Sequence, residues 1–309
     1  MKVVMGVDIG GTDIKFGKFS NHQLIVKDKI KTNKSDDGTH IMDEVFAKID
    51  EMVGFDELVA VGIGIPGPVV NGTALGAHNL RWTKSRNIKE EVLSHYNHRI
   101  KCAVLNDANA ATIGEMEFGG GKGYHDFVFI TIGTGIGGGI IINQRLIEGS
   151  TGSCGEVGHL RVETGNKRRC NCGLYDCVEQ YASATGIVKT AIELRRGRET
   201  ELNQLDVITA KDVFDLAKAG DDVAMEVVYE MVDKLATALS QIATVINPEA
   251  FVIGGGVSSA GEFLIHYLRK RFHELAFYSV KDVKFELAQL GNDAGIYGNE
   301  YYASLELSH

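Results

Sequence analysis

Three cysteines and one histidine are spaced as ligands of a metal ion. Cys170, Cys172 and Cys177 form a C-x-C-x4-C run, and His159 stands eleven residues before the first of them. Three thiolates and one imidazole complete a tetrahedral zinc site with no position left for water, which is typical of structural zinc. Free thiols are the alternative, but they leave the nearby histidine unexplained. The spacing therefore predicts a structural zinc ion that fixes the conformation of this loop.

Two glycine turns, each between apolar runs, form a second pattern. GGT at 10–12 follows VVMGVDI, and GTG at 133–135 follows FVFITI. Bare backbone can approach a phosphate; in the first copy Asp8 can hold Mg²⁺ through water and Thr12 can donate its hydroxyl. The second copy has Thr131 in place of the aspartate. A plain hairpin explains one such turn, but two at equivalent places predict a duplicated nucleotide-binding architecture.

Asn106 and Asp107 follow directly after a predicted strand at 100–105, and a helix of small residues comes next. Ligands of open α/β sheets bind beside the carboxyl ends of strands, so these two side chains lie where catalytic groups are usually found. A second interpretation is that Asp107 only caps the following helix.

Two further loops are candidates for a binding pocket. The loop PGPVVNG, which contains Gly67, follows a predicted strand at 58–65, and Asn79 comes a little later. We expect this loop and Asn79 at the rim of the pocket. The glycine run 254–256 follows a strand at 251–253 and suits a flat adenine face or its ribose. A tight turn is the alternative interpretation of that run.

Apolar periodicity predicts the elements that must position these residues. The remaining strands are expected at 3–9, 14–19 and 24–30, with two more within 127–142. Helices are expected at 43–52, 184–196, 211–219, 222–246 and 294–305. Strands and helices that follow one another in this way predict an α/β fold.

The composition limits the classes of function. The chain has 309 residues, of which 44% are apolar and 24% charged, so it is long enough for two lobes. The net charge of -9 and a single basic run at 167–169 argue against nucleic-acid binding. We expect a cytoplasmic protein, because no apolar run has membrane-spanning length and no signal-peptide pattern precedes Val3. Five cysteines fit a reducing compartment, with Cys102 and Cys154 as small buried residues.

Several motifs together resemble one family. These are DIGGTDIK, PGP, NLRW, NDANAA, IGTGIGGG, GEVGH, CNCGLYDCVE, PEAFVIGGGV and NDAGIYG. They resemble the ROK family (repressor, open reading frame, kinase) of sugar kinases, and within it most closely the bacterial glucokinases. The resemblance implies a duplicated actin-like ATPase fold (ribonuclease H-like, hexokinase type) with two lobes around a central cleft. It implies a smaller lobe of residues 1–118 plus 293–309, and a larger lobe of 119–292 with the zinc loop, the nucleotide site and the oligomer surface.

The resemblance also implies roles for individual residues. Asp107 would be the general base. The sugar would be bound by Gly67, Asn79, Asn106, Asp107, Glu156, His159 and Glu179. Magnesium and the phosphates of ATP would be held by Asp8, Gly10, Gly11, Thr12, Lys15, Gly133, Thr134, Gly135, Ile136, Gly137 and Gly138, with Gly255 and Gly256 beside the adenosine. Structural Zn²⁺ would be bound by His159, Cys170, Cys172 and Cys177, and the other ring nitrogen of His159 would serve the sugar.

The activity implied is ATP-dependent phosphorylation of the 6-hydroxyl of a hexose, with glucose as the expected substrate. N-acetylmannosamine, fructose or a β-glucoside are alternatives within the same reaction. A sugar-responsive transcriptional repressor is the alternative of another class, but such repressors carry a helix-turn-helix domain ahead of the first strand, which here starts at Val3. A binding module without catalysis is opposed by Asp107 and the two glycine turns. The family also implies a homodimer.

Two positions depart from the family pattern. Asp176 stands where the family usually has glycine, and Cys154 stands where it usually has alanine. All four expected zinc ligands are present. The turn between Cys172 and Cys177 is therefore the part of the loop that differs most from the family pattern.

Overall fold

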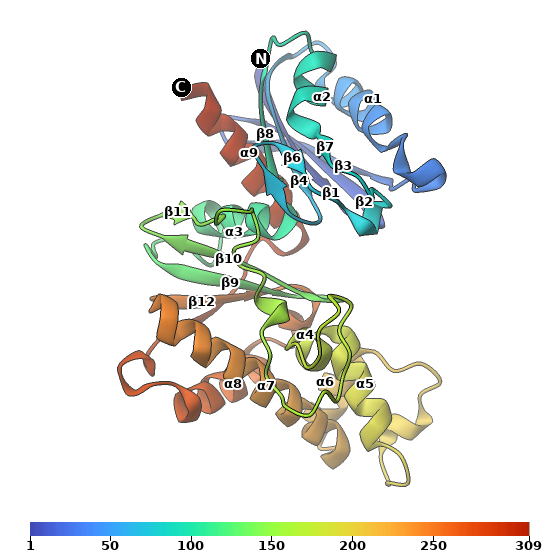
Figure 1. The fold of residues 1–309 in the computed structure, drawn as a ribbon, viewed down its shortest axis with the longest axis vertical. Coiled ribbons are helices and arrows are strands. Elements are labelled where there is room, and N and C mark those ends of the chain that lie inside the picture. Colours follow the sequence, from blue (N-terminus) through green and yellow to red (C-terminus); the bar gives the residue numbers. More distant parts are fainter. Residues whose placement is uncertain (309) are drawn as a thin grey trace. The chain divides into compact units, whose positions relative to one another are not determined.

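The computed structural model describes residues 1–308 and divides the chain into two compact units. Unit 1 contains Met1–Gly123, Arg145–Cys154 and the chain from Leu290 on, and unit 2 contains Tyr124–Gln144 and Gly155–Gln289. Each unit has its own sheet and its own helices (Figure 1). The short segment 145–154 therefore belongs to unit 1, although the residues on both sides of it belong to unit 2.

Unit 1 is built on a five-stranded sheet with the strand order β3-β2-β1-β4-β8. The strands are β1 (Lys2–Ile9), β2 (Asp13–Ser20), β3 (Gln23–Lys31), β4 (Glu57–Ile65) and β8 (Lys101–Asn106). β1, β4 and β8 are parallel, whereas β1, β2 and β3 form an antiparallel meander. Short strands complete the unit: β5 (Val69–Val70), β6 (Thr73–Ala74), β7 (Arg86–Asn87) and β11 (Arg145–Leu146).

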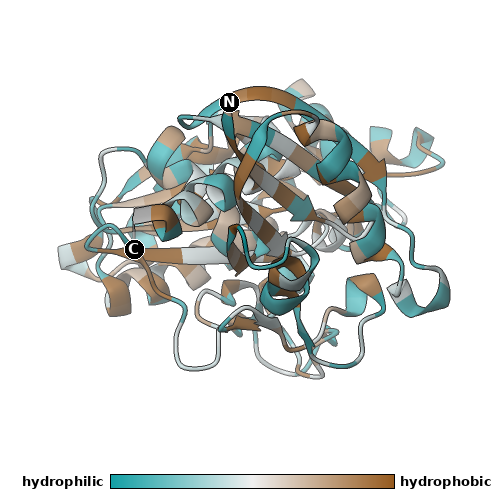
Figure 2. Cartoon of the chain, turned by 90° about the horizontal axis from the view of Figure 1, so that it is seen from above, coloured by the Kyte–Doolittle hydropathy of each residue, from teal (hydrophilic) through white to brown (hydrophobic). Residues whose placement is uncertain are grey.

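Helices cover both faces of this sheet because successive side chains of β1 point to opposite sides. Val3, Met5 and Val7 are buried against α1 (Ile41–Val53) and α2 (Ile88–His95). On the other face lies α9 (Ala294–Leu305), with α3 (Asp107–Phe118) packed along it (Figure 1). The apolar and polar faces of the helices are visible as alternating brown and teal in Figure 2.

Glycines let α9 approach the sheet and α3 at backbone distance. A Cβ atom on Gly62 of β4 would overlap with the carbonyl oxygen of Asn299, and one on Gly298 would overlap with that of Ala110 in α3. The buried Asn299 also donates through Nδ2 to the carbonyl of Val7 at 2.7 Å. Close packing of this kind fixes α3, and with it the residues at its beginning.

Unit 2 contains a sheet in which the strand order is β10-β9-β12-β13. The strands are β9 (Phe127–Ile132), β10 (Ile136–Ile142), β12 (Ala250–Gly254) and β13 (Lys284–Leu287). β9 and β10 form an antiparallel hairpin, and β12 is parallel to both β9 and β13. The helices are α4 (Glu179–Ala182), α5 (Ala184–Leu194), α6 (Ala210–Ala219), α7 (Asp222–Ile246) and α8 (Glu262–Leu275). The long α7 packs against α5, α6 and α8.

The predicted elements agree with the structure within a few residues. Helices 222–246 and 294–305 are confirmed as α7 and α9, and both glycine turns are confirmed as hairpins. α2 and α8 are absent from the prediction, although the buried residues of α8 have helical spacing (Leu264, Ile265, Leu268 and Phe272). None of the described helices is long and apolar enough to cross a membrane. Cys102 is buried as expected, but Cys154 is only partly buried.

The buried carboxylate of Glu115 joins two distant parts of unit 1. Glu115 lies in α3, and it accepts hydrogen bonds from the amide of Gly120 at 2.7 Å and from the amide of Leu290 at 2.9 Å. Gly120 comes just before the chain first leaves unit 1, and Leu290 is where it enters unit 1 for the last time. One side chain therefore ties both of these points to α3.

We expect Glu115→Ala to lower the free energy of unfolding by about 2–4 kcal/mol, because two backbone amides lose their acceptor. Glu115→Gln keeps one acceptor oxygen and should cost less. Urea titration measures both values. Glu262→Ala removes an exposed glutamate from the first turn of α8 and should cost less than about 1 kcal/mol. If Glu115→Ala and Glu262→Ala lowered the free energy of unfolding equally, the stabilising role of Glu115 would be contradicted.

Candidate active site and metal centre

The four predicted metal ligands lie together in unit 2. The ligand atoms of His159, Cys170, Cys172 and Cys177 are all within 4.8 Å of one another. His159 Nδ1 is 3.7 Å from Cys170 Sγ, and Cys172 Sγ is 3.6 Å from Cys177 Sγ. A tetrahedral zinc ion with Zn–S bonds of about 2.3 Å places its sulfur ligands about 3.8 Å apart. The four side chains therefore fit a zinc ion with little rearrangement.

Backbone hydrogen bonds hold the ligand-bearing segments side by side. The amide of Val178 donates to the carbonyl of Leu160 at 2.8 Å, next to His159 and Cys177. Within the loop, the amide of Cys170 donates to the carbonyl of Leu174 at 2.8 Å. These hydrogen bonds bring together residues that are separated in the sequence. The loop has few apolar side chains, so side-chain packing alone would not hold it in this conformation.

The imidazole of His159 points its two nitrogens at different groups. Nδ1 faces Cys170, whereas Nε2 lies 3.8 Å from the Glu156 carboxylate. The side chains of His159 and Glu156 are 37% and 46% exposed, so a small polar ligand has access to both. This arrangement agrees with a ring that serves a metal on one side and a hydroxyl on the other; the sugar contact itself stays a prediction.

Glu179 begins α4 and contacts the β9–β10 hairpin. Its Oε2 accepts a hydrogen bond from the amide of Ile136 at 3.0 Å, and it lies so close to Gly135 that a Cβ atom there would overlap with it. The structure therefore joins a residue that was predicted to bind sugar to the turn that was predicted to bind phosphate. The resemblance alone did not indicate this contact.

Both glycine turns join antiparallel strands, but the turn of the second hairpin is one residue shorter than that of the first. Ile9 pairs with Ile14 and Asp8 with Lys15 in unit 1, and Ile132 pairs with Ile136 in unit 2. Lys15 Nζ is 3.4 Å from Asp8 Oδ2 and donates to the carbonyl of Asn292 at 2.9 Å. Burial raises the pKa of the Asp8 carboxyl, and the nearby Lys15 ammonium opposes this rise. A divalent cation at this carboxylate would favour its charged form in the same way.

The remaining predicted residues of the first hairpin lie in its turn. Gly10 donates its amide to the carbonyl of Asp13 at 3.1 Å, and Thr12 is exposed. A side chain on Gly11 would come within 3.3 Å of Asn79 Cβ. The structure thus brings Asn79 next to this turn.

β8 ends at Asn106, and α3 begins at Asp107. Asn106 Oδ1 accepts hydrogen bonds from the amides of Ala108 at 2.9 Å and Asn109 at 3.1 Å, so Asn106 is the N-cap of the helix. Its Nδ2 donates to the carbonyl of Gly67 at 3.1 Å. The Asp107 carboxylate also accepts a hydrogen bond from the amide of Ala108 at 2.8 Å, so both side chains interact with the first turn of α3.

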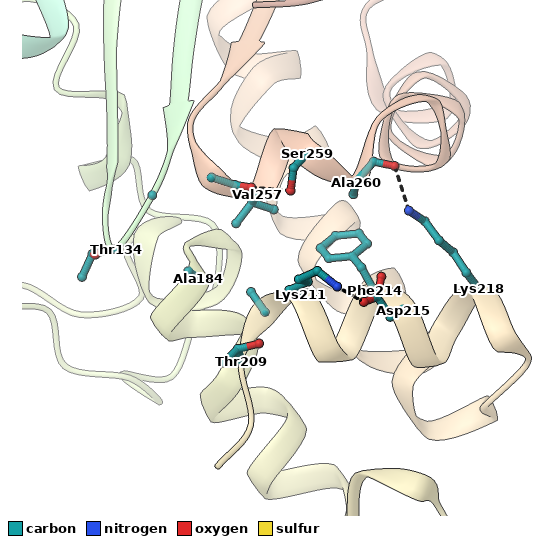
Figure 3. Close-up of a pocket in the computed structure, with 13 residues that line it drawn as sticks. Thr134, Ala184, Thr209, Lys211, Phe214, Asp215, Lys218, Val257, Ser259 and Ala260 are labelled. Carbon is teal, nitrogen blue, oxygen red and sulfur yellow. Dashed lines mark hydrogen bonds and ion pairs between the residues drawn. The ribbon is translucent and has the colours of Figure 1, made fainter. Parts of the chain in front are cut away.

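A cavity of about 530 Å³ lies in unit 2 next to the second hairpin (Figure 3). Gly133 and Thr134 of the hairpin and Gly256 of the 3-10 turn Gly256–Ala260 line it, as the prediction requires for a nucleotide. Its volume lies within the roughly 300–1,000 Å³ of small-molecule sites. Gly255 is also required by the protein itself, since a Cβ atom there would overlap with the backbone of Ile132 at the end of β9.

Helix α6 supplies the wall of this cavity that the prediction missed. Phe214 and Lys218 line it, and Lys218 Nζ donates to the carbonyl of Ala260 at 3.1 Å on the opposite side. Thr209 caps α6 and also lines the cavity. The sequence predicted the helix but held no motif that linked it to the glycine run, because the two meet only in the folded unit.

The predicted residues are distributed over both units. Unit 1 holds Asp8, Gly10, Gly11, Thr12, Lys15, Gly67, Asn79, Asn106 and Asp107. Unit 2 holds Gly133–Gly138, Glu156, His159, Cys170, Cys172, Cys177, Glu179, Gly255 and Gly256. Gly137 and Gly138 lie within β10, with Gly137 paired to Thr131.

Comparison with known proteins identifies the family. The ROK family matches residues 4–305. This chain is a member of the ROK family. It is 37% identical over 308 residues to a glucokinase of Halalkalibacterium halodurans, with 95% of this chain and 92% of that protein covered. It is 34% identical to a glucokinase of Streptomyces coelicolor over 96% of both chains.

A solved ROK structure supports the same assignment. The crystal structure of a ROK family glucokinase from Streptomyces griseus in complex with glucose and AMPPNP is 34% identical, with a TM-score of 0.82 and coverage of 98% of this chain and 99% of that one. The predicted α/β fold of the actin-like ATPase, hexokinase type is therefore confirmed.

We expect Gly135→Ala to lower the free energy of unfolding by about 1–3 kcal/mol, because the new methyl group displaces Glu179 from the amide of Ile136. Gly133→Ala is the matched control in the same turn, since a Cβ atom there meets no described protein atom within 4 Å. Thermal unfolding of both variants tests this. A control that is as unstable as Gly135→Ala would show that the loss does not come from Glu179.

Proposed function

We propose that this ROK protein is an ATP-dependent glucokinase, which transfers the γ-phosphoryl group of ATP to the 6-hydroxyl of glucose. The observation that carries this proposal is similarity over nearly the whole chain to proteins named glucokinase, one of them solved with glucose and an ATP analogue. The residues present agree with this reaction, since carboxylates and amides suit the hydroxyls of a sugar and glycine turns suit phosphates.

We assign the role of general base to Asp107. Its position at the carboxyl end of β8 and in the first turn of α3 favours a charged carboxylate, because the positive end of the helix dipole lies there. The carboxylate accepts the proton of the 6-hydroxyl while the sugar oxygen bonds to the γ-phosphorus and the bond from that phosphorus to ADP breaks. Asn106, fixed by its three hydrogen bonds, holds a neighbouring hydroxyl.

The remaining sugar hydroxyls are assigned to Asn79 in unit 1 and to Glu156, His159 and Glu179 in unit 2. Each of these offers an acceptor or a donor, and two of them are oriented by other contacts: His159 by Cys170 and Glu179 by the amide of Ile136. A hydroxyl that leaves water needs such a partner. Orientation by neighbouring groups reduces the entropy that is lost when the sugar binds.

The phosphates and the adenosine are assigned to the two hairpins and to the cavity of unit 2. Asp8 and Lys15 offer a carboxylate and an ammonium at the first hairpin, and Mg²⁺ held near Asp8 would neutralise charge on the phosphates. Gly256 and Phe214 offer apolar surface for the adenine in the cavity. Lys218 is held by Ala260 and keeps α6 in place.

The reaction is tested by a coupled assay of ADP release over a panel of glucose, N-acetylmannosamine, fructose and a β-glucoside. Glucose is expected to give the highest kcat/KM. Activity on N-acetylmannosamine without activity on glucose would contradict glucose as the substrate. No activity on any of these sugars would contradict the proposed kinase reaction.

Asp107→Asn should lower kcat about 100- to 10,000-fold, the range for loss of a general base, with little change in the affinity for glucose. Steady-state kinetics gives kcat, and glucose binding by calorimetry gives the affinity. Asp43→Asn is the matched control, because Asp43 is an exposed aspartate in the first turn of α1. Wild-type turnover by Asp107→Asn would exclude Asp107 as the base.

We propose Zn²⁺ as the metal of the Cys3His centre, because three thiolates and one imidazole at these distances match its preferred ligands. Metal analysis of the purified protein should give about one zinc per chain. Cys177→Ser should remove most of it, and chelation of the wild type should lower its melting temperature. Full activity and an unchanged melting temperature without metal would contradict a structural role.

A further inference from the structure

Asp176, the residue before Cys177, has a backbone conformation that favours glycine. Its φ is +62°, in the left-handed region where a side chain at Cβ is crowded. Aspartate tolerates this region better than most residues, but a glycine would adopt it without strain. The departure from the family's glycine therefore needs a compensating interaction of the side chain.

The carboxylate of Asp176 is completely buried and is hydrogen-bonded through Oδ1, whereas Oδ2 has no hydrogen-bond partner among the described residues. Its exposed fraction is 0%, and Oδ1 accepts from the amide of Arg168 at 2.8 Å and from the hydroxyl of Tyr181 at 2.9 Å. The guanidinium of Arg161 lies 3.8 Å from Oδ2. Moving a carboxylate from water into the protein interior costs free energy. The interactions of Asp176 with its partners must offset this cost, so we expect them to hold the partner residues in place.

Each partner of Asp176 stands next to a predicted ligand. Arg161 comes two residues after His159, Arg168 two residues before Cys170, and Tyr181 two residues after Glu179. One carboxylate therefore contacts three segments of unit 2 that carry predicted ligands of the metal or the sugar.

The backbone of Asp176 joins two of the same segments. Its amide donates to the carbonyl of Arg168 at 2.8 Å, and its carbonyl accepts from the amide of Val162 at 3.0 Å. These bonds need the left-handed turn but no side chain. Glycine and aspartate would both supply them, so the carboxylate is what this chain adds.

Arg168 links the surroundings of Asp176 to other elements of unit 2. Its guanidinium donates to the carbonyl of Gln180 at 2.9 Å and to Thr190 of α5 at 3.0 Å, and it stacks 4.4 Å above the ring of Tyr181. Tyr181 is itself buried. The partners of Asp176 are therefore anchored to the core of the unit, and the cysteine loop is anchored through Asp176 to them.

We infer that Asp176 is a positioning residue of the metal centre, which holds the ligand-bearing segments together so that the metal dissociates slowly and His159 keeps its orientation toward the sugar. This inference rests on the proposed zinc site and the proposed glucokinase activity. It assigns to the side chain a task that the family's glycine cannot perform.

Three substitutions separate the turn from the carboxylate. Asp176→Gly keeps the turn and removes the acceptor, Asp176→Ala removes the acceptor and keeps the strain, and Asp176→Asn keeps an acceptor oxygen and tolerates the turn. Asp37→Gly is the matched control, because Asp37 is an exposed aspartate with a φ of +56°. Zinc content is measured first, then the rate of zinc release into an excess of chromogenic chelator, then kcat and KM for glucose.

Asp176→Gly and Asp176→Ala are expected to release zinc about 10- to 100-fold faster than the wild type, the range for loss of a group that orients metal ligands. Asp176→Asn and Asp37→Gly are expected to release it at nearly the wild-type rate. In Asp176→Gly the KM for glucose should rise more than kcat falls, because His159 and Glu156 are disturbed while Asp107 belongs to the other unit.

Wild-type release of zinc by Asp176→Gly would overturn the inference, because Asp176 would then only occupy a turn. Faster release by Asp37→Gly would overturn it as well, since the effect would not be local. A wild-type protein without zinc would overturn the metal site and this inference together, whereas the sugar panel tests the kinase reaction separately. Metal content therefore distinguishes failure of the inference from failure of the proposed site.

Discussion

The orientation of one imidazole ring connects the two kinds of chemistry in unit 2. Nδ1 of His159 faces a thiol, and Nε2 faces a carboxylate. A ring cannot turn toward one group without leaving the other, so the geometry of the cysteine loop and that of the candidate sugar site depend on each other. A structural metal bound here would therefore influence the proposed sugar site, although it would leave no coordination position open for substrate.

Carboxylates that are buried or partly buried join separate segments of the chain. Glu115 joins α3 to Gly120 and Leu290, Glu179 joins α4 to the second glycine hairpin, and Asp176 joins the cysteine loop to Arg168 and Tyr181. In each case the carboxylate accepts a backbone amide hydrogen bond. Such a bond is directional and short, so it fixes a loop whose apolar side chains are too few to fix it by packing.

Glycine has the complementary role at the same places. At Gly62 and Gly298 the missing side chain allows α9 to touch β4 and α3, and at Gly135 it leaves room for the carboxylate of Glu179. The glycines of the hairpins were predicted as phosphate ligands. The structure adds that Gly135 and Gly255 are also required by their protein neighbours, so their presence alone is not evidence for a nucleotide.

The sequence by itself determined the secondary structure of the long apolar elements, the candidate metal ligands and the family. These depend on local patterns: 3.6-residue periodicity in α7, apolar strands around each glycine turn, and a C-x-C-x4-C run after a histidine. Only the tertiary structure decided that the side-chain amide of Asn106 reaches the carbonyl of Gly67, that α6 closes the cavity beside Gly256, and that the carboxylate of Asp176 is buried. These features depend on contacts between residues that are far apart in the chain. Local patterns carry no information on such contacts, because each partner is an ordinary side chain until folding brings it to the other.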